Sequence, residues 1–266
     1  MLWDSHMHTD FSGDGEAAPE SMAEKAANLG LPGICITDHL DLDYPEDPEL
    51  FLVDLPVYQQ KISDLQKKFQ DRLPIHFGIE LGLQPHLAGR LEAAAASQPF
   101  DFVIGSVHVV HGMDPYYPAY YEGRTEKEAF KEYFSCVLEN LQAFDSFDAL
   151  GHLDYVVRYG INGNADYHCE DYAEIIDEIL RLLIRKEKAL EVNTAGFKYG
   201  LGHPNPCEEI LRRYHELGGR LITIGADAHR PEHIAFAFDR LPALLKDCGF
   251  DFYAVYQKRK PEILPL

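Results

Sequence analysis

The sequence lacks three features that would each point to a different class of protein: a long apolar run, paired cysteines and an excess of basic residues. No stretch of about 18 consecutive apolar residues occurs, so we expect no membrane-spanning helix. The first residues, MLWDSHMHTD, contain neither a basic start nor a following apolar run, so we expect no secretory signal there. The five cysteines are scattered with no CxxC pair. This spacing argues against a disulfide framework or a cysteine zinc site, and it favours a reducing cytoplasm.

Acidic residues dominate the charge of the chain. The 44 Asp and Glu residues outnumber the 24 Lys and Arg residues, and the formal net charge is -20. We therefore expect the protein to bind neither nucleic acid nor an anionic membrane. Hydrophobic residues make up 46% of the 266 residues, which is enough for one packed core. We predict a single domain over residues 1–266.

Short apolar segments alternate with longer amphipathic segments along the chain. The predicted strands cover residues 2–6, 33–37, 75–81, 102–108, 149–152, 189–193, 221–226 and 252–255. The predicted helices cover residues 19–29, 55–72, 86–96, 126–144, 171–188, 206–217 and 238–247. This alternation indicates an α/β protein with a parallel sheet, and seven or eight repeats favour a closed barrel over an open sheet. Two long loops, residues 41–54 and 109–124, are predicted to be functional because such loops are uncommon in compact domains.

Histidines and acids recur at or near the C-terminal ends of the predicted strands. In chain order, these residues are His6, His8, Asp38, His39, Glu80, His108, His152, Asp227 and His229. In a barrel, all strand ends of this kind surround one mouth, which is where barrel enzymes place their chemistry. The two histidines of an HxH pair share one face of a strand, because side chains alternate with period two.

This recurrence predicts a metal site. Imidazole suits zinc, iron and manganese, whereas carboxylates favour harder ions or bridge two ions. The candidate ligands are too many for one four-coordinate ion, but they suit two or three ions that share bridging groups. Such sites are typical of phosphate-ester hydrolysis, so we predict a hydrolase whose partner is a small phosphate ester.

At these positions the sequence resembles the PHP (polymerase and histidinol phosphatase) superfamily. The stretches HMHTDFSGDG, ITDH, GIE, IGSVH, GHLD and GADAH are similar to its successive motifs and occur in the same order. Two further stretches, HLDYVVRYG and EVNTAGFKYG, most resemble the histidinol-phosphatase branch. The resemblance implies a distorted (β/α)7 barrel of the TIM-barrel type, with a trinuclear metal site at the C-terminal ends of the strands.

The resemblance also implies which residues hold each ion. The first ion would be held by His6, His8, Glu80 and Asp227. Glu80 would bridge to a second ion, which would also be held by His108 and His152. The third ion would be held by Asp14, His39 and His229. Members of the superfamily use zinc, manganese or iron, and some have a histidine where this chain has Asp14.

For function, the resemblance implies hydrolysis of L-histidinol phosphate to L-histidinol and phosphate in histidine biosynthesis, by attack of a metal-bound hydroxide. Arg158 follows His152 by six residues and is predicted to be catalytic and to bind the phosphate, because a guanidinium pairs bidentately with phosphate. Lys198 is a second substrate-binding candidate. The tyrosine-rich stretch from Asp114 to Gly123 is predicted to contact the leaving group.

Two alternatives remain open from the sequence. The first is a PHP phosphoesterase that acts on another small ester, such as a sugar or nucleotide phosphate. The second is a PHP module that has lost activity. A panel of phosphate esters tests the first alternative, and metal analysis tests the second.

Overall fold

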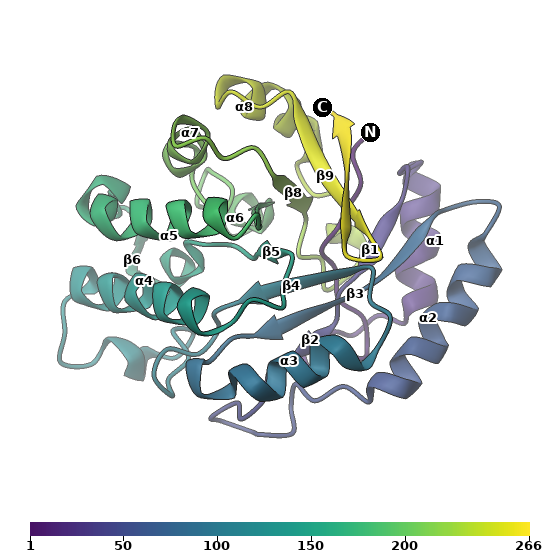
Figure 1. The fold of residues 1–266 in the computed structure, drawn as a ribbon, viewed down its shortest axis with the longest axis horizontal. Coiled ribbons are helices and arrows are strands. Elements are labelled where there is room, and N and C mark those ends of the chain that lie inside the picture. The colour runs from purple at the N-terminus through teal and green to yellow at the C-terminus, as the bar shows by residue number, and fades with distance from the viewer.

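The structure is a computed structural model that describes residues 1–266, with short strands surrounded by helices (Figure 1). The helices are α1 (Pro19–Leu29), α2 (Leu55–Phe69), α3 (Ala88–Ser97), α4 (Glu126–Ala143), α5 (Ala173–Arg185), α6 (Ala195–Lys198), α7 (Glu208–Glu216) and α8 (Leu241–Asp247). The strands are β1 (Ile34–Ile36), β2 (His39–Leu40), β3 (Ile75–Gly82), β4 (Phe102–Ser106), β5 (Ala149–Leu150), β6 (Ile161–Asn164), β7 (Ala189–Asn193), β8 (Ile222–Gly225), β9 (Phe252–Gln257) and β10 (Lys260–Pro265). Two short 3₁₀ helices also matter for the site, η3 (Tyr155–Tyr159) and η4 (Cys169–Tyr172).

The main sheet is parallel and curls into a barrel. Its strands follow the order β1-β3-β4-β5-β7-β8, and β2 also pairs with β3. The N-terminal segment, residues 4–8, joins the two edges of this sheet. Asp4 forms a parallel bridge to Ile34 of β1, and Met7 forms one to Ala228, which follows β8. The segment therefore occupies the seventh strand position, and the predicted barrel of α/β type is confirmed.

The predicted elements differ from the observed ones mainly at strand ends. The predicted strand at residues 2–6 makes isolated bridges rather than a regular ladder. β4 ends at Ser106 and β5 at Leu150, so His108 and His152 lie in the loops that directly follow these strands. The predicted strand at residues 252–255 is not part of the barrel. It is β9, which pairs antiparallel with β10, a strand whose sequence KPEILP has no clear apolar alternation.

The β9–β10 hairpin covers the N-terminal end of the barrel. Ala254 and Tyr256 of β9 form a buried cluster with residues at the start or middle of the barrel strands, namely Cys35, Phe102, Ile104, Ala149 and Ala189. The Tyr256 ring stacks on Phe102 with the ring centroids 5.1 Å apart. The opposite, C-terminal end of the strands is therefore the end at which a site can form.

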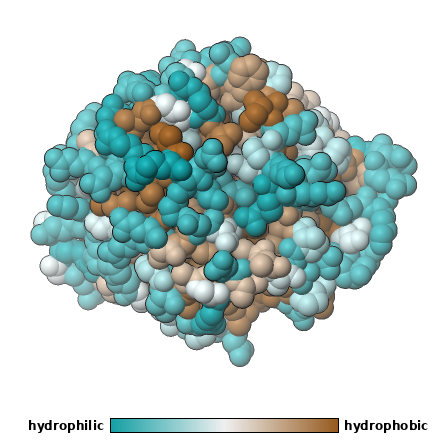
Figure 2. All heavy atoms as spheres, viewed as in Figure 1, coloured by the Kyte–Doolittle hydropathy of each residue, from teal (hydrophilic) through white to brown (hydrophobic).

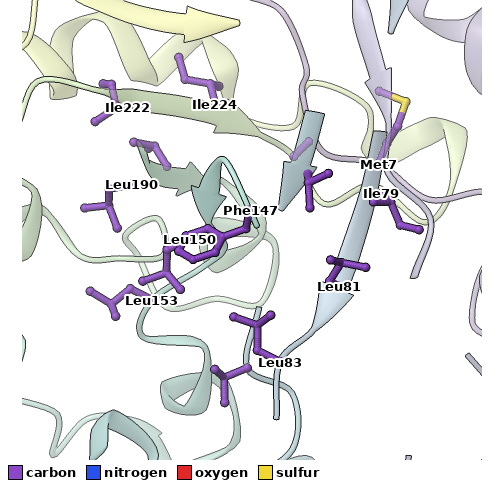
Figure 3. Packing of buried hydrophobic residues seen from close by; sticks show 14 of the residues in the cluster. Met7, Ile79, Leu81, Leu83, Phe147, Leu150, Leu153, Leu190, Ile222 and Ile224 are labelled. Carbon is purple, nitrogen blue, oxygen red and sulfur yellow. The ribbon is translucent and has the colours of Figure 1, made fainter. Parts of the chain in front are cut away.

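Side chains of the barrel strands alternate between the helices and the barrel interior. In β3, Ile79 and Leu81 belong to the main hydrophobic cluster of 66 buried residues. In β7, Leu190 does the same, and Figure 3 shows these three residues within the packed core. The acids between these apolar positions, Glu80 and Glu191, contact histidines instead. Because side chains alternate along each strand, Glu80 and Glu191 point toward the site while their apolar neighbours pack in the core.

The helices are amphipathic and form the outer layer. In α5, Ile176, Ile179, Leu180 and Leu183 are buried, while Glu178 on the other side is exposed. Hydrophilic side chains dominate the face in Figure 2, where apolar residues form separate patches. None of the helices combines the length and apolar character that crossing a membrane requires.

Candidate active site

His6 and His8 lie side by side in the segment that joins the edges of the barrel, and both are fully buried. Nδ1 of His6 lies 2.5 Å from Oε1 of Glu191, and Nδ1 of His8 lies 3.1 Å from Oγ of Ser12. The Ser12 hydroxyl donates to Asp38, so its oxygen accepts from His8. Because each Nδ1 is a donor, a neutral ring leaves its Nε2 with a free lone pair. The two Nε2 atoms are 3.1 Å apart, an arrangement that suits a shared cation.

Glu80 lies at the centre of the histidine cluster and is fully buried. Its two carboxylate oxygens lie within 3.0–3.4 Å of ring nitrogens of five histidines, His6, His8, His39, His108 and His152. Burial alone would raise the pKa of Glu80, but the charges of His6 and His39 outweigh it and hold that pKa well below its ordinary value. A carboxylate whose two oxygens both face histidine ring nitrogens is suited to bridge two ions.

A third group of side chains lies beside the first two. Oδ2 of Asp14 lies 3.1 Å from Nε2 of His229, and Oδ1 lies 3.8 Å from Nε2 of His39. Asp227 connects this group to the rest, because its Oδ1 lies 3.5 Å from both Nε2 of His8 and Nδ1 of His229. Asp227 has a positive φ of 52°, a conformation that non-glycine residues adopt rarely and often at functional sites. The structure thus brings together all nine residues predicted as metal ligands.

The donor set fits divalent transition-metal ions. Several buried polar atoms of the cluster have no hydrogen-bond partner, namely Nδ1 of His39, Oε2 of Glu80 and Nε2 of His229. Such atoms are costly to bury unless another partner satisfies them. Three overlapping triads have ligand atoms within 4.8 Å of one another: His8, His39 and His229; His6, His8 and Glu80; and His39, Glu80 and His108. Imidazole and carboxylate ligands in this arrangement can hold more than one ion.

The GADAH motif begins with Gly225 because the backbone at this position lies close to the side chain of His6. A Cβ added to Gly225, the last residue of β8, would lie 2.3 Å from Cβ of His6 and 2.7 Å from Oε1 of Glu191. Any larger side chain would therefore displace His6 or its carboxylate partner.

Sequence reasoning missed two carboxylates that orient histidines of the predicted ligand set. Glu191 accepts from His6, as described above, and Oδ2 of Asp41 lies 2.7 Å from Nδ1 of His108. Carboxylates that bind the far nitrogen of a ligand histidine fix its tautomer and orientation. The sequence contained a feature that could have indicated each of these two carboxylates. Glu191 is a lone acid in an apolar strand, and Asp41 closely follows the ITDH motif.

Asp38 has a different role from the one that its position suggested. The sequence pattern groups it with the candidate ligands, but it does not join the cluster. Its carboxylate accepts hydrogen bonds from the Thr9 N–H at 2.6 Å, the Thr9 hydroxyl at 2.8 Å and the Ser12 hydroxyl at 2.7 Å. Asp38 therefore holds the loop that follows His8.

Arg158 lies in η3 and lines the cavity above the histidine cluster. Its Nη2 lies 3.2 Å from Oδ2 of Asp227, and its guanidinium lies over the rings of Tyr155 and Tyr199. Burial would lower the pKa of Arg158, but the charge of Asp227 outweighs it, so the guanidinium stays charged. Lys198 of α6 does not line this cavity. Its Nζ donates to the backbone carbonyl of Asp227 at 3.1 Å.

Aromatic side chains form the outer wall of the cavity. They are Tyr44, Phe51, Tyr155, Tyr159 and Tyr199. Of the tyrosine-rich stretch predicted to contact the leaving group, only Asp114 lines the cavity, where it accepts a hydrogen bond of 2.7 Å from the Tyr44 hydroxyl. The expectation for its tyrosines was wrong. Tyr120 and Tyr121 are buried in the core, and Tyr116 is 60% exposed.

Comparisons with known proteins identify the family and the relatives of this chain. The PHP domain family matches residues 4–195. A histidinol-phosphatase of Lactococcus lactis is 35% identical, over 97% of this chain and 95% of its own length. A Thermotoga maritima protein named a probable histidinol-phosphatase is 32% identical, over 96% of each chain.

A solved structure has the same fold over nearly the whole chain. It is the Lactococcus lactis histidinol phosphate phosphatase in complex with zinc, L-histidinol and phosphate. The two structures align with a TM-score of 0.92, at 35% identity, over 98% of this chain and 100% of the other. The family match covers most of the chain and contains seven of the nine predicted ligands. The protein therefore belongs to the PHP domain family.

Proposed function

We propose that the protein is a metal-dependent phosphomonoesterase that hydrolyses L-histidinol phosphate to L-histidinol and phosphate, a step of histidine biosynthesis. The observation that carries this proposal is one cavity, in which a histidine–carboxylate cluster, a buried arginine and an acid–aromatic wall meet. The relatives named above support the choice of substrate.

The cluster is proposed to hold two or three divalent ions of zinc, manganese or iron. We assign His6, His8, Glu80 and Asp227 to the first ion, and Glu80, His108 and His152 to the second. Asp14, His39 and His229 are assigned to the third. When bound, such ions supply a nucleophile from water at neutral pH, neutralise charge on the phosphoryl oxygens and stabilise the departing alkoxide. Zinc is the ion in the related Lactococcus structure.

Arg158 is proposed to bind the phosphate group and so to act in catalysis. It faces the cavity, stays charged and is held between two tyrosine rings, so little side-chain freedom is lost on binding. Its only ionic partner in the structure is Asp227, which leaves guanidinium donors for the substrate. Lys198 is proposed as a weaker contributor that acts through its hydrogen bond to Asp227.

The acid–aromatic wall is proposed to receive the leaving group. Histidinol carries an amine and an imidazole, and both can be cationic. Asp114 offers a carboxylate oxygen beside Tyr44, and Tyr159 and Phe51 offer aromatic rings that attract cations. Sugar and nucleotide phosphates would leave this carboxylate without a cationic partner.

A panel of phosphate esters tests the proposal. L-histidinol phosphate should exceed sugar phosphates in kcat/KM by at least about 100-fold, because a site built for polar groups of one substrate rejects analogues that lack them. Equal rates over the panel would exclude histidinol phosphate as the specific substrate and favour another small ester. No turnover of any ester by metal-loaded protein would favour an inactive module.

We also infer that residues 1–266 form one domain that acts in the cytoplasm. The main hydrophobic cluster contains residues from Leu2 to Val255, which supports one domain. The scattered spacing of the five cysteines, with no CxxC pair, supports a reducing compartment.

A further inference from the structure

Two cysteines that are far apart in the sequence meet outside the active site. Cys169 begins η4, Cys207 directly precedes α7, and Glu209 lies in the first turn of α7. Their two Sγ atoms and a carboxylate oxygen of Glu209 all lie within 4.8 Å of one another. Cys207 is buried, Cys169 is half-buried and Glu209 is exposed, so solvent can reach the group from one side. The scattered cysteine spacing argued against a cysteine metal site, because residues 169 and 207 are far apart in the sequence and form no CxxC pair.

Open space adjoins the three side chains. A cavity of about 180 Å³ is lined by all three of them together with His168 and His203. A second cavity, between α5 and α7, is also lined by Cys169 and Glu209. The group therefore has room for an ion and for water molecules that complete its coordination.

We propose that Cys169, Cys207 and Glu209 form a second metal site, separate from the histidine cluster, that binds a thiophilic divalent ion such as zinc. Two thiolates and one carboxylate match the ligands that zinc prefers, with a fourth position left for water. The carboxylate distinguishes this site from a simple dithiol. Glu209 also forms an exposed ion pair of 3.8 Å with Arg212, and a carboxylate at this position is not needed for a disulfide.

The position of the site suggests what the ion does. The Cys207 N–H donates to Oδ2 of Asp154 at 3.0 Å, and Oδ1 of Asp154 accepts from Nδ2 of Asn205 at 2.6 Å. Oδ1 of Asn205 in turn lies 3.3 Å from Nε of Arg158. An ion that ties Cys207 to η4 would brace the segment that positions Arg158. The role is structural support of the active site rather than contact with substrate.

Cobalt titration of the reduced, metal-free protein tests this site directly. Thiolate ligands give cobalt an intense near-ultraviolet charge-transfer absorption, which histidine and carboxylate ligands cannot produce. We expect this absorption in the parent protein and in the Cys35→Ala control, whose cysteine is buried in β1 and belongs to none of the groups that could hold a metal ion. Cys169→Ala and Cys207→Ala should each weaken or abolish it. Glu209→Ala should weaken cobalt binding at this site by at least about tenfold, because even outer partners of metal ligands contribute about 10- to 100-fold.

Alkylation provides a second readout that does not depend on the variants. Zinc should protect Cys169 from iodoacetamide in the parent protein, as measured by mass spectrometry of peptides, because a bound thiolate is not free to react.

Circular dichroism confirms that each variant is folded, and Cys169→Ala is the mildest change because this residue is half-buried.

Three results would overturn the proposal. The first is no thiolate absorption in fully reduced protein with excess cobalt. The second is absorption that survives in Cys169→Ala and Cys207→Ala but disappears in Cys136→Ala, which would place the thiolate beside His111 and Glu139 instead. The third is a Cys169–Cys207 disulfide that forms in the presence of zinc. None of these readouts depends on phosphatase activity, so the proposed function can fail or hold independently.

Discussion

Oε1 of Glu191 lies 2.5 Å from Nδ1 of His6 in the interior of the barrel, although 185 residues separate them in the chain. The other oxygen of Glu191 accepts from the His152 N–H at 2.8 Å. One carboxylate therefore orients a proposed ligand of the first ion and the backbone of a proposed ligand of the second.

Glu191→Gln should weaken zinc affinity by about 10- to 100-fold, because it removes the charge that orients the His6 ring. Competition with a chromophoric chelator in the Cys169→Ala background, which removes the proposed thiolate site, measures this affinity. Glu178→Gln, the same chemical change on the exposed side of α5, is the matched control and should leave it unchanged. Equal affinities in the two variants would show that Glu191 does not support the metal site.

Glu80→Ala should lower the metal content and abolish turnover, because a bridging carboxylate holds two ions together. The parent should contain more than one ion per chain in the histidine cluster. Both proteins are best analysed by mass-spectrometric metal determination in the Cys169→Ala background, which removes the proposed thiolate site from the count. At most one ion per chain in the Cys169→Ala protein after metal-replete purification would contradict the multinuclear assignment.

Arg158→Ala should reduce kcat/KM by about 10- to 150-fold for every phosphomonoester, since a hydrogen bond to a charged group contributes about 1.5–3 kcal/mol. Steady-state kinetics measure this loss. Metal content must be determined in parallel, because Arg158 also contacts Asp227. Arg213→Ala, which removes a surface partner of Asp177, is the control and should be fully active. An Arg158→Ala enzyme with normal kinetics would rule out the phosphate-binding role.

Asp114→Asn should reduce kcat/KM for histidinol phosphate by about 10- to 150-fold, because a cationic leaving group loses a charged partner. The generic substrate p-nitrophenyl phosphate should be little affected. The ratio of kcat/KM for histidinol phosphate to kcat/KM for p-nitrophenyl phosphate separates recognition of the leaving group from the chemistry at phosphorus. An equal loss with both substrates would mean that Asp114 supports the site as a whole.

Hydrolysis in oxygen-18 water should place one label in the released phosphate and none in the alcohol, because we expect water to attack phosphorus directly. Mass spectrometry of both products distinguishes the outcomes. Label in the alcohol would indicate attack at carbon. A trapped covalent phosphoprotein would indicate a nucleophilic side chain.

Eight of the nine ligand candidates could be predicted because each lies in or near the C-terminal end of a barrel strand, where local sequence and barrel topology together determine position. Asp14 was implied only by the resemblance to the PHP superfamily. The side chains that surround and orient those candidate ligands could not be predicted. Whether Glu191 meets His6 depends on the register between strands from opposite ends of the chain. Tyr44 and Phe51 reach the cavity from a loop with no periodic pattern, and Cys169 meets Cys207 only through the packing of η4 against the start of α7. Strand ends were overextended at His108 and His152 because apolar residues continue into the loops.

The bridge between Met7 and Ala228 also has a consequence for biosynthesis of the protein. The two residues are separated by roughly 220 positions, and contacts of such long range form late and slowly. At about 5–20 residues per second, the ribosome needs roughly 10 to 45 seconds to make the second partner after the first. During that time His6 and His8 are part of an open chain without Glu191 or Asp227 in place. The proposed ions can therefore be captured in their final arrangement only near the end of translation or after release, so we expect metal supply at that stage to determine how much newly made protein becomes active.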